Sequence, residues 1–353
     1  MTKLRYMFVG AVSSTATLAL SLAAVAQAAP SQAETAKATM ASTFTVGFAN
    51  EATTAPFQIN VQNSMDAGAK AAGDKLISLN NNYDDATALR NAQILANDKV
   101  DVAVEFQVDS KIAPAIAQTF KKAGIKWTIS IDIPQPGAIF FGANNYADGL
   151  LAGQHAGEYA KAHGWKPSQT YEILLNLPAA GPIPQLRMNG MRDGLAKAFP
   201  GMPKSQVLQQ SAGAGTTSAA QAVTASILPR IPTSDHIVIF GINDESSQGG
   251  LRAVQVAGRE ASTIVSSQGA DGVGLGEIRT DPHWIGSTAY FPEYYGKYIF
   301  VLIKDLQSGK KVTPYVFMPR VYLSAADVAQ YYPGKTTVAI KPPPGGIEFS
   351  TTP

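Results

Sequence analysis

Short apolar runs and amphipathic stretches alternate along the chain from Phe44 to Gln268. Consecutive apolar residues predict buried strands, whereas apolar residues recurring every three or four positions predict helices. The predicted strands span residues 44–49, 75–79, 100–106, 126–131, 171–177, 236–240 and 262–268. The predicted helices span residues 59–73, 84–98, 110–124, 185–199, 216–230 and 246–258. Continuous apolar strands separated by helices are typical of a parallel sheet with both faces covered.

The alternation runs through one set of strands and helices and then starts again at Tyr171. Two successive runs of this kind predict two similar lobes rather than one long sheet. Roughly 320 mature residues also exceed one typical core. We therefore expect an α/β protein of two lobes, each built on a parallel sheet, followed by a Pro/Gly-rich tail at 342–353 without regular structure.

The first residues have the pattern of a secretory signal peptide. Lys3 and Arg5 precede the uncharged stretch 8–25, and the small residues Ala26 and Ala28 follow it. We expect cleavage at the end of residues 1–29, a polar linker at 30–43, and an exported protein that is not embedded in the membrane. An uncleaved N-terminal membrane anchor is the alternative.

Composition narrows the class of protein further. The chain has no cysteine, which excludes disulfides, thiolate metal sites and a lipid anchor on an N-terminal Cys, so a Gram-negative periplasm fits best. With 28 basic and 26 acidic residues and no long charge run, we expect no nucleic-acid partner. Four histidines without metal-binding spacing predict no metal site.

No motif for catalysis stands out. The nucleophile elbow, the Walker A loop and the dinucleotide fingerprint are all missing from the sequence. The adjacent acids Asp84 and Asp85 are expected to cap a helix. The glycine-rich "GADGVGLG" (269–276) is expected to be a loop. We therefore expect a protein that is not an enzyme and carries no cofactor.

Five segments, taken in order, resemble those of the type I periplasmic substrate-binding proteins, of which the ribose-binding protein is a member. They are "TAPFQ" (54–58), "SIDIP" (130–134), "GANNYADGLLAGQHAGEY" (142–159), "RMNGMRDGLAKAF" (187–199) and "GINDESSQGGLRAVQVAG" (241–258). The likeness extends from about Phe44 to Val321, most of the mature chain.

The resemblance implies two Rossmann-like lobes joined by three hinge crossings, with the ligand bound between them; hinge closure of periplasmic binding proteins is a standard example of this motion. The implied first lobe spans residues 44–143 plus 291–313. The implied second lobe spans residues 144–290 plus 314–341. The resemblance also implies seven ligand contacts: Phe57, Gln58, Asp132, Arg187, Asn243, Gln268 and Tyr290.

Four of these contacts have definite expected roles. Phe57 would lay its ring against the apolar face of a cyclic ligand. Asp132 would accept hydrogen bonds from hydroxyls, Arg187 would donate to them, and Asn243 would do both. The alternatives are core packing for the phenylalanine, a turn before Pro134 for the aspartate, and a solvated helix surface for the arginine.

The stretch after the strand at 236–240 adds two further acids. We expect Asn243 to contact the ligand. We expect Asp244 to cap a helix that begins near Ser246, with Glu245 adding charge to its first turn.

The chain also departs from the ribose-binding pattern. Ala55, Gln58, Ile133 and Gln268 stand where that pattern has Asn, Phe, Arg and Asp, and the segment 211–218 lacks the expected aromatic residue. Because such losses change which hydroxyls can be bound, we expect another monosaccharide, a deoxy sugar or a polyol rather than ribose. The candidate replacement walls are Trp127, Trp284 and Tyr290.

The resemblance implies a monomeric periplasmic protein that delivers a small-molecule ligand to an ABC permease in the inner membrane. A receptor with the same fold that presents its ligand to a chemoreceptor or sensor kinase is the alternative. A transcriptional regulator is rejected because the signal peptide occupies the place of its DNA-binding segment. A secreted hydrolase or isomerase lacks support because no nucleophile or metal motif is present.

Overall fold

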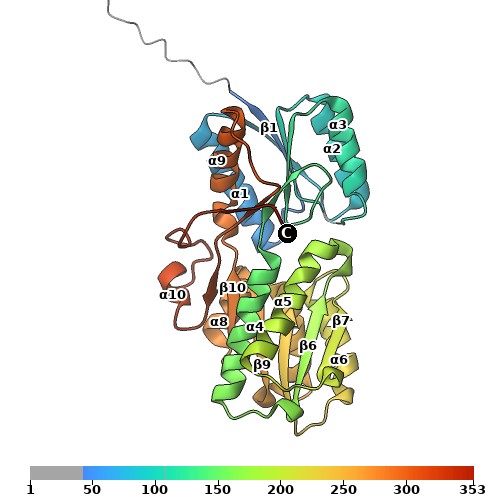
Figure 1. Ribbon diagram of the computed structural model, residues 1–353, viewed down its shortest axis with the longest axis vertical. Helices are drawn as coiled ribbons and strands as arrows, with labels where there is room; N and C mark the ends of the chain where they lie inside the picture. The colour runs from blue at the N-terminus through green and yellow to red at the C-terminus, as the bar shows by residue number, and fades with distance from the viewer. Residues whose placement is uncertain (1–42, 108) are drawn as a thin grey trace, which may run out of the picture. The chain divides into compact units, whose positions relative to one another are not determined.

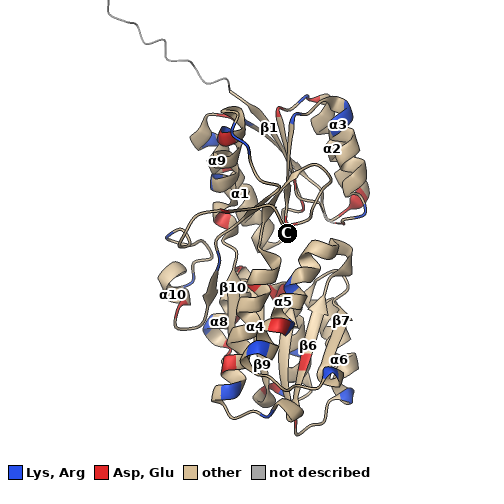
Figure 2. Ribbon diagram, in the orientation of Figure 1, with Lys and Arg blue, Asp and Glu red and all other residues tan. Residues whose placement is uncertain are grey.

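The computed structural model describes residues 43–107 and 109–353. The predicted signal peptide and nearly all of the predicted linker lie outside these residues. Within them, no helix combines the length and the apolar character needed to cross a bilayer. Acidic and basic positions are interspersed along the described helices rather than gathered in one region (Figure 2).

The first sheet has the strand order β13-β11-β5-β4-β3-β1-β2. Its neighbours pair in parallel, except that β13 runs antiparallel to β11. The strands are β1 (Thr45–Asn50), β2 (Lys75–Asn80), β3 (Val102–Glu105), β4 (Trp127–Ile131), β5 (Ile139–Gly142), β11 (Tyr315–Phe317) and β13 (Glu348–Ser350). Four of these strands match predicted ones; β5, β11 and β13 were not predicted.

Helices cover both faces of the first sheet. They are α1 (Pro56–Ala72), α2 (Asp85–Asn97), α3 (Ala113–Ala123) and α9 (Tyr295–Gln307). Figure 1 shows α1 and α9 on one side of β1, and α2 and α3 on the other. The alternation of strand residues explains this, because Phe48 packs in the core with α9 while its neighbour Ala49 packs with α2 and α3. Asp84 caps α2 by accepting from the backbone N–H of Thr87 at 2.7 Å, as predicted.

The second sheet has the strand order β12-β10-β9-β8-β6-β7, and only β12 is antiparallel to its neighbour. Its strands are β6 (Thr170–Asn176), β7 (Val207–Ser211), β8 (His236–Gly241), β9 (Thr263–Gly269), β10 (Trp284–Ala289) and β12 (Val321–Leu323). The associated helices are α4 (Asn145–Ala162), α5 (Pro182–Ala198), α6 (Thr217–Ile227), α7 (Asp244–Val256), α8 (Gly272–Thr280) and α10 (Val328–Tyr331). Two α/β units with mostly parallel sheets confirm the predicted fold class.

Short 3-10 helices connect several of these elements. They are η1 (Pro167–Gln169), η2 (Pro178–Ala180), η3 (Lys204–Gln206), η4 (Leu228–Arg230), η5 (Glu260–Ser262) and η6 (Pro292–Tyr294). The glycine-rich segment 269–276 is not the predicted loop. It contains the first turn of α8, whose N-cap Asp271 accepts from the backbone N–H of Val273 at 2.9 Å.

Glycines let α4 and α5 pack at close range. A Cβ atom at Gly149 would lie 2.1 Å from the carbonyl oxygen of Arg187, and one at Gly190 would lie 2.2 Å from that of Tyr146. Because real Cβ atoms do not approach backbone oxygens so closely, these two positions require glycine. This close packing fixes the position of Arg187 on α5 relative to α4.

The chain passes from the first sheet to the second between β5 and α4, returns between β10 and η6, passes again between β11 and β12, and returns a second time between α10 and β13. Arg320, in the passage between β11 and β12, forms an ion pair with Asp148 on α4, with Nε and Oδ1 3.4 Å apart. The sheet memberships differ from the predicted boundaries, which placed residues 314–341 in the second lobe and residues 342–353 in a tail without regular structure. β11 and β13 belong to the first sheet because their backbones pair with β5 and with each other.

Candidate functional site

The predicted contact residues come from the carboxyl ends of strands in both sheets, or from the helices that follow them. In open parallel sheets, this is the edge at which ligands bind. Phe57 and Gln58 lie in the first turn of α1, and Asp132 follows β4 directly. Arg187 lies on α5. The other three lie at the ends of β8, β9 and β10: Asn243, Gln268 and Tyr290.

Asp132 is held in a strained but well-bonded position. Its φ angle is +54°, which is unusual for a residue other than glycine and often marks a functional position. Its Oδ1 accepts from the backbone N–H of Ala143 at 3.0 Å, and its Oδ2 accepts from the hydroxyl of Tyr295 at 3.3 Å. Burial raises the pKa of this carboxyl, and the nearby charge of Arg187 opposes that rise.

Arg187 is not a solvated surface residue, since only 8% of it is exposed. Its Nε donates to Asn145 Oδ1 at 3.1 Å, and one terminal nitrogen donates to the carbonyl of Ile242. Its guanidinium carbon lies 4.9 Å from the centre of the Tyr290 ring, in cation–π geometry. The guanidinium has five N–H groups, so donors beyond these two bonds remain for a ligand.

Tyr290 contacts Arg187 directly, and Gln268 holds Tyr290 in position. The hydroxyl of Tyr290 donates to Gln268 Oε1 at 2.6 Å, and Gln268 Nε2 donates to the carbonyl of Asp148 at 3.2 Å. Gln268 is fully buried and Tyr290 is 5% exposed. In this conformation the glutamine amide is satisfied within the protein, and the tyrosine presents its ring to Arg187.

Asn243, and not Asp244, is the N-cap of α7. Its Oδ1 accepts from the backbone N–H of Ser246 at 3.0 Å, and its Nδ2 donates to the carbonyl of Gly215 at 3.0 Å. The prediction that the aspartate caps this helix was therefore wrong. The helix begins at Asp244, earlier than expected, so the capping position moves back to the asparagine.

Asp244 instead links the start of α7 to the segment before α8 and to β10. It is fully buried, its Oδ2 accepts from the backbone N–H of Asp271 at 3.1 Å, and its Oδ1 accepts from the hydroxyl of Ser287 at 3.0 Å. Burial raises its pKa, and the charge of Asp271 adds to that effect. These contacts give it a structural role.

On the first sheet, Phe57 stands between two aromatic rings. It meets Phe106 edge-on at 6.3 Å and Tyr295 edge-on at 5.6 Å between ring centres, and it remains partly exposed. Beside it, Gln58 Nε2 donates to Glu51 Oε2 at 2.5 Å. Phe57 thus combines core contacts with a partly open surface.

The acidic residues Glu51, which bonds to Gln58, and Glu245 were not among the predicted contact residues. Burial raises the pKa of Glu51 to about 7, with a further contribution from the charge of Asp132. Burial also raises the pKa of Glu245 to about 8, and the charges of Asp271 and Glu51 contribute. The pKa of Tyr83 is raised by burial and by Glu51, Glu245 and Asp271. Charges raise the pKa of another group only when the two are close together. Glu51, which follows β1 of the first sheet, and Glu245, which follows β8 of the second, therefore lie near one another.

The two units also touch directly. The backbone N–H and the hydroxyl of Ser110 both donate to the carbonyl of Ala179, at 3.1 and 3.0 Å. A Cβ atom at Gly272 would lie 3.1 Å from the Cβ of Pro56, so the start of α8 abuts the start of α1. We call the two bonds from Ser110 the Ser110 latch. The segments that follow strands of the two sheets are therefore in contact.

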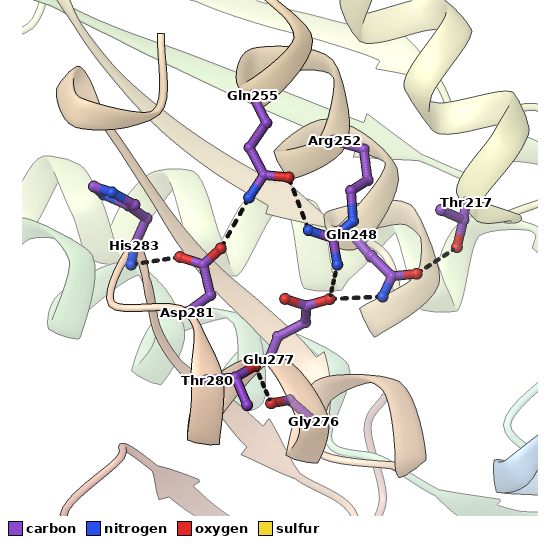
Figure 3. A network of polar contacts seen from close by, with 9 residues as sticks. All are labelled: Thr217, Gln248, Arg252, Gln255, Gly276, Glu277, Thr280, Asp281 and His283. Atoms are coloured by element: carbon purple, nitrogen blue, oxygen red, sulfur yellow. Dashed lines mark hydrogen bonds and ion pairs between the residues drawn. The ribbon is translucent and has the colours of Figure 1, made fainter. Parts of the chain in front are cut away.

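A second polar network links α6, α7 and α8 away from these residues (Figure 3). Gln248 Nε2 and an Arg252 terminal nitrogen donate to Glu277 Oε1, at 2.7 and 2.5 Å. His283 donates to Asp281 through its backbone N–H at 2.8 Å, so its ring takes no part. The network braces helices. Among the described residues, no group of three or more histidines and acids is arranged to hold a metal ion.

The geometry can now be compared with known proteins. The family model for the periplasmic binding protein domain matches residues 46–311. No match was found among curated protein sequences.

Among solved structures, an ABC transporter solute-binding protein from Mycobacterium smegmatis with bound glycerol is similar. Its TM-score is 0.72 at 19% identity, covering 85% of this chain and 100% of that chain. The Caulobacter myo-inositol binding protein has a TM-score of 0.68 at 22% identity, covering 81% of this chain and 95% of that one. A solute-binding protein from Agrobacterium vitis bound with α-D-tagatopyranose has a TM-score of 0.68 at 20% identity, covering 81% and 96%.

At these identities the similar structures show a shared fold. The family model, in contrast, covers most of the chain and includes all seven predicted contact residues. The chain belongs to the periplasmic binding protein family.

Proposed function

We propose that this protein captures a small polar ligand, a monosaccharide, deoxy sugar or polyol, between the carboxyl ends of its two sheets. The single observation that carries the proposal is the Asp132–Arg187 pair. Asp132 follows β4 of the first sheet, and Arg187 lies on α5 beside the second sheet. The charge of Arg187 acts to lower the pKa of Asp132, which places the two side chains in one region. A ligand that bonds to both must contact both lobes.

The side chains around this pair favour a ligand that donates many hydrogen bonds. The carboxyl groups near this region, those of Glu51, Asp132, Asp148, Glu245 and Asp271, outnumber the guanidinium groups of Arg187 and Arg320. Carboxylates accept hydrogen bonds and hydroxyls donate them, so a polyhydroxylated ligand matches this set. The proteins of similar fold that bind glycerol, myo-inositol and tagatopyranose support this class.

The proposed contacts divide into three pairs and one single residue. Phe57 and Gln58 form the wall of the first lobe, and Asp132 and Arg187 hold hydroxyls from opposite sides. Gln268 and Tyr290 position the arginine through the contacts described above. Asn243 donates one N–H of its Nδ2 to Gly215, so its second N–H remains for a ligand.

Binding by both lobes gives a mechanism for delivery. A ligand bonded to Asp132 and Arg187 stabilises the arrangement in which the lobes meet, relative to an open one. The Ser110 latch is formed in the same arrangement. An ABC permease that recognises the closed form would then receive loaded protein. The proposal includes cleavage of the signal peptide and a monomeric protein in the periplasm.

The proposal is tested by thermal shift across a library of sugars, deoxy sugars and polyols. We expect at least one compound to raise the melting temperature of wild type in a saturable way, without conversion to product. Asp132→Asn should lose the shift, whereas Asp98→Asn, at an exposed helix end, should keep it. A library without hits would contradict the proposal.

A further inference from the structure

The loop that follows α10 lies between the two lobes and is bonded to both. α10 packs against α8 of the second lobe. From there the chain crosses to its end on the first sheet, where β13 pairs with β11 (Figure 1). We call residues 332–340, the first part of this passage, the clasp. It contains none of the seven proposed contact residues, so it is a separate feature of the molecule.

The second lobe holds the clasp at both ends. Arg279, on α8, donates through Nη2 to the carbonyls of Tyr332 and Thr336, at 2.9 and 2.8 Å. The backbone N–H of Ile340 donates to the carbonyl of Tyr331, in α10, at 2.8 Å. Hydrogen bonds from a charged donor are stronger than those between neutral groups, so Arg279 is the stronger of these attachments.

The first lobe holds the middle of the clasp. The backbone N–H of Ala339 donates to Glu293 Oε1 at 2.8 Å, and its carbonyl accepts from the hydroxyl of Tyr294 at 3.4 Å. The carbonyl of Thr337 accepts from Asn60 Nδ2, on α1, at 3.4 Å. Because η6 packs against α1 and leads into α9, all three bonds attach the clasp to the first lobe.

The clasp also packs on one of the passages between the lobes. Phe291, in the passage between β10 and η6, is fully buried and has a φ angle of +54°. Its ring stacks on Tyr332 at 6.0 Å and meets Tyr331 edge-on at 5.4 Å between ring centres. A residue other than glycine keeps such a backbone angle only where its surroundings hold it. The clasp therefore helps to hold this passage in its present shape.

The clasp has no slack between its two sets of bonds. Thr336 is bonded to the second lobe, and its neighbour Thr337 is bonded to the first. Ala339 is bonded to the first lobe, and its neighbour Ile340 is bonded to the second. An extended chain spans at most about 3.6 Å per residue. A rotation that separates α8 from η6 by more than this reach must therefore break the bonds to one lobe.

We propose that the clasp holds the two lobes together when no ligand is bound, so that the lobes separate only when its bonds to one lobe break. In a protein with an open and a closed form, contacts made only in the closed form raise its population before the ligand arrives. Each lost bond of this kind changes the ratio of the two forms roughly five-fold. The device goes beyond the proposed function, because it acts without a ligand.

The test measures the distance between the lobes by pulsed electron paramagnetic resonance, in protein dialysed free of ligand. Because the chain has no cysteine, Lys122→Cys on α3 and Ala222→Cys on α6 place one spin label on each lobe. Both positions are exposed. We expect the full mature protein to show one main interlobe distance.

Two variants weaken the clasp, each at one lobe. Arg279→Met removes the donor to Tyr332 and Thr336 but keeps a long apolar stem, and Glu293→Ala removes the acceptor for Ala339. In each variant, the ratio of molecules at a second interlobe distance to those at the first should rise about five-fold over wild type.

Two matched controls accompany these variants. Arg192→Met removes an exposed arginine from α5, and Glu293→Gln keeps an oxygen that accepts from Ala339. Both should give the wild-type distance distribution. The pair of Glu293 variants keeps the test decisive if Arg279→Met fails to fold.

Two results would overturn the proposal. One is a wild-type distance distribution in both Arg279→Met and Glu293→Ala, even where their melting temperatures fall, since the clasp would then serve stability alone. The other is an equal second population in Glu293→Gln or in Arg192→Met. Because no ligand takes part in the measurement, failure here leaves the proposed function standing.

Discussion

Replacing Glu172 with glutamine should make the protein more stable at alkaline pH. Glu172 lies in β6, is 1% exposed, and its Oε1 has no hydrogen-bond partner among the described residues. Burial raises its pKa from 4.5 to about 8. Between these values the folded protein binds a proton that the unfolded chain has released. Stability therefore falls as pH rises through this window.

The magnitude follows from the size of the shift. One pKa unit corresponds to about 1.4 kcal/mol, so this carboxyl lowers the free energy of unfolding by about 3–4 kcal/mol between pH 5 and pH 8. The glutamine side chain that replaces it stays neutral at every pH. We expect Glu172→Gln to match wild type within about 1 kcal/mol at pH 5 and to exceed it by about 4 kcal/mol at pH 8.

The assay is urea unfolding followed by circular dichroism at several pH values between 5 and 8. Glu105→Gln in the first sheet should behave in the same direction, because burial raises the pKa of Glu105 to about 8. Glu158→Gln, on an exposed position of α4, is the control. Curves for Glu172→Gln and wild type that stay parallel across this pH range would refute the reasoning.

Three further outcomes are expected. Gly190→Ala should lower the free energy of unfolding in urea by about 3 kcal/mol, because its Cβ meets a backbone oxygen of α4. Gly276→Ala, with open space around it, should leave that free energy unchanged. Equal effects of the two substitutions would contradict this packing. Tyr290→Phe should cost about 1–3 kcal/mol by leaving the buried Gln268 Oε1 without its donor, and unchanged stability would count against that bond. A hydroxylated ligand that needs the ionised form of Glu51, whose pKa is about 7, should bind about ten-fold more tightly at pH 8 than at pH 6 by calorimetry. Glu51→Gln should abolish this pH dependence of the affinity. A Glu51→Gln variant that retains the pH dependence would exclude Glu51 as its cause.

The fold could be predicted because its strands are short and continuously apolar. The run from Ile237 to Phe240 is buried on both faces, so it appears as an uninterrupted apolar segment. β11 and β13 escaped prediction because each has three residues and forms only by pairing with β5 or with each other. Nothing local marks Glu348–Ser350 as a strand inside a Pro/Gly-rich tail.

The site was predictable only in part. The sequence placed Asp132 and Arg187 at the ends of elements, and their burial and bonds are tertiary features. Asn243 caps α7 in place of Asp244 because the helix begins two residues earlier than predicted. Glu51 directly follows β1, which could have marked it, but its proximity to Glu245 on the other sheet depends on how the sheets meet.

The most direct test of the central claim is calorimetric titration of the hydroxylated ligand found in the library screen. The account predicts saturable binding by wild type and by Asp98→Asn. It predicts at least about ten-fold weaker binding by Asp132→Asn and by Arg187→Lys, since each loses charged hydrogen bonds from one lobe. Equal affinity for wild type and both site variants would contradict capture of the ligand between the two lobes.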